Sequence, residues 1–94
     1  MPLIDIVKKS LRINTNAFDD ELTNIIDSCK IDLELAGVNN IVETDPLIQR
    51  AVILYAKYNF GYNDNSEKIQ AAYDMLKNAL ALSAKYVEPI VTEG

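Results

Sequence analysis

The segment Asp45–Gly61, with the sequence DPLIQRAVILYAKYNFG, constrains the fold more than any other part of the chain. Asp45 followed by Pro46 is typical of a helix start, because the carboxylate accepts from free backbone N–H groups and proline needs no donor there. Apolar residues then recur at helical spacing and spread beyond one stripe: Leu47, Ile48, Ala51, Val52, Ile53, Leu54, Tyr55 and Ala56. A helix that is apolar on most sides is usually enclosed by its neighbours. We therefore predict a central helix that ends at Gly61, a suitable C-terminal cap.

Three further segments have helical periodicity: Leu3–Arg12, Phe18–Ala36, and a last helix that begins at Asp64 or Ser66 and runs to about Lys85. The expected inner face of the second helix contains Phe18, Leu22, Ile25, Ile26, Cys29 and Leu33. The expected inner face of the last helix contains Ile69, Ala72, Tyr73, Leu76 and Leu80. Gly37 is expected to end the second helix, and Ile41 and Val42 to anchor the connector after it.

The last nine residues, YVEPIVTEG, differ from the rest of the chain. They are apolar and β-prone, and Pro89 interrupts them, so we expect them to run extended. The sequence thus predicts an all-α fold, a small bundle of one short and three longer helices with an extended C-terminal tail. The helical domain is expected over residues 1–85 and the tail over residues 86–94.

Composition narrows the class of protein. A chain of 94 residues with 49% apolar residues is enough for one packed domain, and association is a natural source of further stability for a domain of this size. The net charge is −5, and no block of Lys and Arg forms a footprint for phosphate groups. No apolar run reaches the ~20 residues of a membrane span. The chain also begins without a signal-peptide pattern, so we expect it to fold in a reducing cytoplasm.

The residues also argue against catalysis. The chain has no His and a single Cys, Cys29, which excludes common zinc sites and Cys–His or Ser–His chemistry. Its glycines cannot form a phosphate-binding loop. The acidic residues 19–21 point in different directions on a helix, and Asp27, Asp32 and Glu34 are expected on a solvated face. We predict neither enzymatic activity nor a cofactor or metal.

The order of these motifs resembles a known family. Leu11-Arg12-Ile13 is followed by the acidic helix start at Phe18–Leu22, then by Gly37-Val38, Asp45-Pro46-Leu47, Ala51–Tyr55 and Phe60-Gly61. This pattern, over roughly residues 3–85, is similar to that of the small head–tail connector proteins, or adaptors, of tailed phages and prophages, some of which are described as DNA-packaging proteins.

The resemblance implies a structural virion protein at the head–tail interface, assembled in the host cytoplasm. It implies a homo-oligomeric ring of about a dozen copies under the portal protein, which extends the DNA channel and meets the next connector or tail protein. DNA would pass through without sequence-specific binding, and no membrane would be involved. The family has no catalytic residues to transfer to this chain.

Two sets of apolar residues are candidate contacts with a neighbouring subunit or the portal. The first set is the tail: Tyr86, Val87, Pro89, Ile90 and Val91. The second is Ile31 and Leu35, which fall on the outer face of the second helix. Two alternative functions remain open: a small helical DNA-binding regulator, and a protein-interaction module that forms one-to-one complexes.

Overall fold

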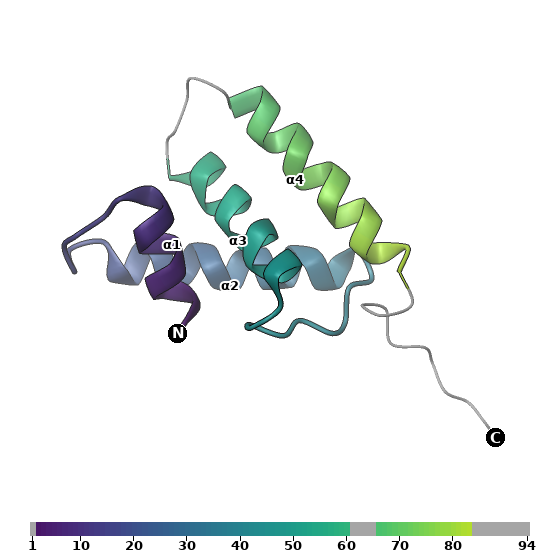
Figure 1. Ribbon diagram of the computed structural model, residues 1–94, viewed down its shortest axis with the longest axis horizontal. Helices are drawn as coiled ribbons and strands as arrows, with labels where there is room; N and C mark the ends of the chain where they lie inside the picture. The colour runs from purple at the N-terminus through teal and green to yellow at the C-terminus, as the bar shows by residue number, and fades with distance from the viewer. Residues whose placement is uncertain (1, 61–65, 84–94) are drawn as a thin grey trace.

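The computed structural model describes residues 2–60 and 66–83, and within these ranges the chain forms four helices and no strand (Figure 1). The short helix α1 spans Leu3–Leu11, and the longer helices are α2 (Asp19–Leu35), α3 (Pro46–Asn59) and α4 (Ser66–Ala81). The predicted all-α bundle of one short and three longer helices is confirmed. The tail expected over residues 86–94 lies outside the described residues, as does its boundary with the helical domain.

Helix α3 is the centre of the bundle, as predicted. Oδ1 of Asp45 accepts a hydrogen bond from the backbone N–H of Leu47 at 2.8 Å, which caps the helix start. The helix contacts α1, α2 and α4. Its buried residues are Ile48, Ala51, Val52 and Ala56. Enclosure is incomplete, because Leu47 and Tyr58 stay exposed. Gly61, the expected cap, lies outside the described residues.

Helix α2 crosses behind α1 and α3 in Figure 1 and buries one stripe against them. The stripe contains Leu22, Ile26, Cys29 and Leu33, as its periodicity predicted, with Ile25 half-buried beside it. The prediction for Phe18 was wrong. This residue precedes the helix and is 41% exposed, although its ring packs edge-on against Phe60 at 5.4 Å between centroids.

The end of α2 is set by Gly37, as predicted. Gly37 has a φ of 105°, a conformation that residues with a side chain rarely adopt. The chain reverses there, so that the N–H of Val38 bonds the carbonyl of Leu33 at 2.9 Å and Val38 becomes fully buried. Ile41 packs against the core as expected. Val42 does not: it lies in a turn closed by its own carbonyl and the N–H of Asp45, and its side chain is exposed.

Helix α4 lies alongside α3 and buries only Tyr73 and Leu80 (Figure 1). Ala72, predicted on the inner face, is exposed because it lies about a quarter turn away from Tyr73. The helix ends at Ala81, earlier than the predicted Lys85, and the N–H of Ser83 bonds the carbonyl of Leu80 in a closing turn. The predicted Asp64 cap lies outside the described residues.

A single core joins the four helices. Its buried members are Leu3, Val7, Leu11, Leu22, Ile26, Cys29, Leu33, Val38, Ile48, Ala51, Val52, Ala56, Tyr73 and Leu80. Most of these buried residues belong to α1, α2 and α3, and α4 contributes two. The core therefore leaves apolar residues on the outside of α2 and α4.

Candidate assembly surfaces

The outer face of α2 carries the first candidate surface. Ile31 and Leu35 lie one helical turn apart, opposite the buried stripe, and are 57% and 81% exposed. Asp27 lies one turn before Ile31; it is exposed, and its side chain has no partner among the described residues. We call Asp27, Ile31 and Leu35 the α2 ridge. The structure places the two predicted apolar residues where a partner can reach them, and their contact with one stays a prediction.

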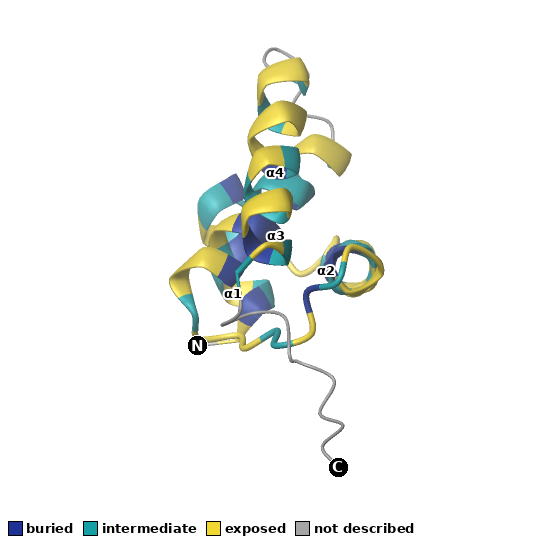
Figure 2. Ribbon diagram, turned by 90° about the vertical axis from the view of Figure 1, so that its right-hand side faces the viewer, coloured by how far each residue is buried: buried dark blue, intermediate teal, exposed yellow. Residues whose placement is uncertain are grey.

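The outer face of α4 carries a second surface that the sequence analysis missed. Met75 is 73% exposed and Leu82, just past the helix end, is 88% exposed. Ala72 and Ala79 alternate with them, so that positions 72, 75, 79 and 82 repeat with the three- and four-residue spacing of a helix–helix seam. Lys68 stands one turn before Ala72 on the same face. We call these five residues the α4 seam, and Figure 2 colours much of the α4 ribbon as exposed.

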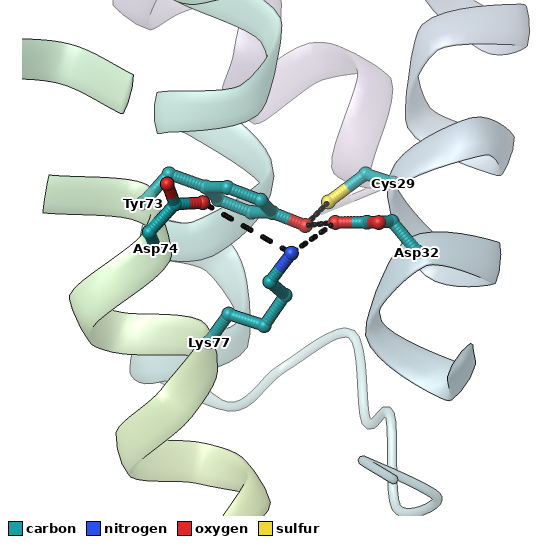
Figure 3. A network of polar contacts seen from close by, with 5 residues as sticks. All are labelled: Cys29, Asp32, Tyr73, Asp74 and Lys77. Atoms are coloured by element: carbon teal, nitrogen blue, oxygen red, sulfur yellow. Dashed lines mark hydrogen bonds and ion pairs between the residues drawn. The ribbon is translucent and has the colours of Figure 1, made fainter. Parts of the chain in front are cut away.

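A polar cluster ties α4 to α2 beside these surfaces (Figure 3). The hydroxyl of Tyr73 donates to Oδ2 of Asp32 at 2.7 Å, and Nζ of Lys77 donates to the same oxygen at 3.0 Å. The thiol of Cys29 lies 3.8 Å from the Tyr73 hydroxyl. Lys77 also lies 5.3 Å from the centre of the Tyr73 ring and 4.0 Å from a carboxylate oxygen of Asp74. Asp32, predicted on a solvated face, is therefore a partly buried anchor for α4.

Burial controls protonation in this cluster. It raises the pKa of the Cys29 thiol to about 12 and raises the pKa of Tyr73, which also donates a hydrogen bond to Asp32. Burial opposes the charge of Asp32 too, but the hydrogen bonds from Tyr73 and Lys77 outweigh it and lower the pKa of that carboxyl. At neutral pH the cluster therefore holds a neutral thiol, a neutral phenol and the charged carboxylate of Asp32, and Lys77 forms ion pairs with Asp32 and Asp74. This arrangement fastens two helices and offers no base poised near neutrality.

A cavity of about 150 Å³ opens between α3 and α4. It is lined by Tyr55, Tyr58, Asn59, Gln70, Tyr73 and Asp74. The rings of Tyr55 and Tyr73 meet at 5.2 Å between centroids, and the side-chain amide of Asn59 donates to the carbonyl of Tyr55 at 2.8 Å. Tyr55, Tyr73 and Asn59, three of the six lining residues, therefore already contact other parts of the protein. We assign the cavity no ligand.

Ion pairs take up part of the positive charge. Lys8 binds Asp19 at 2.8 Å, and Lys30 binds Glu43 at 2.6 Å. Within residues 2–60 and 66–83, no three His, Cys, Asp or Glu residues gather in a way that would hold a metal ion. No helix in the described part of the chain has the length and hydropathy needed to cross a bilayer.

The remaining predicted contact residues, Tyr86, Val87, Pro89, Ile90 and Val91, lie outside the described residues. The structure therefore brings together only part of the predicted set. The α4 seam had a signal in the sequence, since the apolar spacing at positions 72, 75, 79 and 82 is as regular as that of the inner face. A pattern that marks both sides of a helix does not say which side faces the core.

Comparison with known protein families gives a match over most of the chain. The model of a family described as phage connector protein matches residues 3–87, which is most of the chain. No curated protein and no solved structure shows a significant match. The matched range contains all four helices, both exposed surfaces and the polar cluster between them.

Proposed function

Because the chain belongs to the phage connector protein family, we propose that it is a structural head–tail connector that assembles as a ring under the portal of a tailed phage or prophage. The ring extends the DNA channel and offers its far side to the next connector or tail protein. The protein works at the head–tail interface of the virion, having been made and assembled in the host cytoplasm. The observation that carries this proposal is the family match over residues 3–87.

The exposed surfaces support a role in assembly. A small domain gains stability when its leftover apolar faces are covered by neighbours. Ile31 and Leu35 on α2 are such residues, and we propose that they contact an adjacent subunit. A ring needs contacts of this kind on two sides of each copy.

The distribution of charge supports a passive channel. The chain carries 14 acidic and 9 basic residues, and Lys8, Lys30 and Lys77 are bound to carboxylates. Proteins that grip DNA instead present unpaired Lys and Arg toward the phosphates. We propose that DNA slides past this protein without sequence-specific binding and that the protein has no catalytic role.

The tail is proposed as an arm. The arm contains five apolar residues that follow α4 in the sequence and reaches a neighbouring subunit or the portal: Tyr86, Val87, Pro89, Ile90 and Val91. Removal of residues 86–94 should leave the helical circular dichroism signal intact and abolish association. Assembly that is unchanged after this deletion would exclude the arm.

Mass measurement by light scattering over a concentration series, alone and with the cognate portal, tests the proposed function. We expect closed assemblies of about a dozen copies, either alone or only on the portal. A monomer or dimer that ignores the portal would overturn the connector proposal. Defined one-to-one complexes with another protein would favour an interaction module, and retardation of nonspecific DNA at low salt would favour a DNA-binding regulator.

A further inference from the structure

We infer that adjacent subunits join through two different surfaces, the α4 seam of one copy and the α2 ridge of the next. This inference rests on the proposed ring and names its contact. Each surface lies on the side of its helix opposite the core, so one copy can use both at once (Figure 2). A contact between unlike surfaces is head-to-tail, and such contacts form a ring when the rotation between copies closes.

The two surfaces match in shape. Each is a single helical face with residues one turn apart, and the seam alternates large and small side chains. If the helices lie parallel with Asp27 beside Lys68, then Ile31 falls over the small Ala72. Leu35, one turn later, falls between Met75 and Ala79. A branched side chain seated over alanine is the arrangement that lets two helices pack closely.

The two surfaces also match in charge. Beyond Lys68, the seam residues Ala72, Met75, Ala79 and Leu82 are uncharged, and the half-exposed carboxylate of Asp74 lies off the seam. The only cation of the seam therefore stands at its start. Asp27 stands at the start of the ridge, and the exposed Glu34 lies two turns further along the same side of α2. Among the described residues, neither Asp27 nor Lys68 forms an ion pair. The parallel register that covers the apolar residues also pairs these two charges.

The local charges argue for a second copy as the occupant, because each copy carries both Asp27 on the ridge and Lys68 on the seam. Two copies with a net charge of −5 each repel one another, so they associate best through a surface that carries no acidic residue. The α4 seam is such a surface, and its one charge has the sign that attracts the ridge. The same chain thus supplies both halves of a complementary contact.

Apolar-to-acidic substitutions give the main test. Met75→Asp in the seam and Leu35→Asp in the ridge should each abolish assembly under the condition in which the wild type assembles, alone or on the portal. Both positions are largely exposed, so the helical signal and the unfolding midpoint should stay near wild type. Val42→Asp is the matched control, because Val42 is exposed and lies on neither surface. It should assemble normally.

Charge reversal tests the register. Asp27→Lys and Lys68→Asp each place like charges together, and each should raise the concentration at half-assembly by roughly five-fold. Both changes in one chain should restore assembly, because every head-to-tail contact then regains an ion pair in the opposite sense. Asp5→Lys and Lys9→Asp change the net charge equally at exposed sites on α1, outside both surfaces. These controls should not alter assembly.

The outcomes separate this inference from the proposed function. If the wild type never forms closed assemblies, the connector proposal fails. If it does and Met75→Asp assembles equally well, the seam is not the contact and the inference is wrong. If Asp27→Lys and Lys68→Asp each weaken assembly and the double variant does not restore it, the pairing of Asp27 with Lys68 is also wrong. Loss of assembly in the seam variants alone, with Leu35→Asp unaffected, would indicate a symmetric α4–α4 contact instead.

Discussion

Helices α3 and α4 are similar in length, lie side by side and use their residues differently. Helix α3 has Ile48, Ala51, Val52 and Ala56 buried and contacts every other helix. Helix α4 buries only Tyr73 and Leu80, and a polar cluster completes its attachment to α2. The comparison indicates that α3 serves the fold, whereas α4 divides its sequence between an inner face for the fold and an outer face that the fold does not use.

The sharpest test of this difference compares one apolar residue from each helix. Ile48→Ala should lower the free energy of unfolding by about 2–5 kcal/mol, because it leaves a cavity at a fully buried site in α3. Met75→Ala on the exposed face of α4 should change it by no more than about 0.5 kcal/mol. Urea denaturation of both variants measures the contrast. A large loss from Met75→Ala would mean that the outer face of α4 is part of the monomer's core.

The polar attachment of α4 is tested by removing one hydroxyl group. Tyr73→Phe keeps the buried ring and deletes the hydrogen bond to Asp32, which should cost about 1–2 kcal/mol because the acceptor is charged. Tyr58→Phe removes the hydroxyl of an exposed tyrosine in α3 and should be nearly neutral. Denaturant midpoints compare the two variants. Equal effects would show that the cluster contributes no more than an exposed phenol does.

The start of α3 provides a smaller effect. Asp45→Ala removes the carboxylate that accepts from the N–H of Leu47 and should cost about 1 kcal/mol. Asp45→Asn keeps a capping oxygen and should recover most of that loss. The unfolding temperatures of the two variants, measured by circular dichroism, distinguish Asp45→Ala from Asp45→Asn. If alanine is tolerated as well as asparagine, the position of α3 is fixed by packing without help from its cap.

The smallest expected effect is on pH dependence, through Asp32. Its pKa is lowered in the folded protein, where hydrogen bonds from Tyr73 and Lys77 outweigh burial. Such a group contributes stability above its unfolded pKa, near about 4, and the contribution is lost as pH falls through the folded value. Asp32→Asn should therefore make the unfolding free energy less dependent on pH below about 4. Urea denaturation at a series of pH values measures the change, and an unaltered pH dependence in Asp32→Asn would contradict the role of this carboxyl.

Periodicity predicted the parts of the fold that depend on local sequence. The Asp45-Pro46 start, the stop at Gly37 and the buried stripe of α2 follow from capping chemistry and apolar spacing. Phe18 and Ala72 failed for a different reason. Each fits the apolar spacing of its helix, but whether a neighbour covers the edge of a face depends on how the helices cross, which spacing does not encode.

The candidate site was predicted only in part, for the same physical reason. Ile31 and Leu35 stood out because they fall off a clean stripe. Met75 and Leu82 did not stand out, because the apolar spacing of α4 was already explained by its predicted inner face. The role of Asp32 depends on Tyr73 and Lys77, which are more than 40 residues away along the chain. A contact of that range becomes visible only when α2 and α4 are placed together.

The buried thiol has a practical consequence. Cys29 is the only cysteine of the chain, it is fully buried, and its pKa is about 12, whereas alkylating and oxidising reagents act on the thiolate. The native protein therefore behaves chemically as a cysteine-free background. Each copy of a chain carrying Ile31→Cys and Ala72→Cys would bear two accessible thiols, one on the α2 ridge and one on the α4 seam. At the inferred contact, the ridge thiol of one copy would face the seam thiol of the next. Mild oxidation of the assembled variant should produce a ladder of covalently linked subunits that ends in a closed circle.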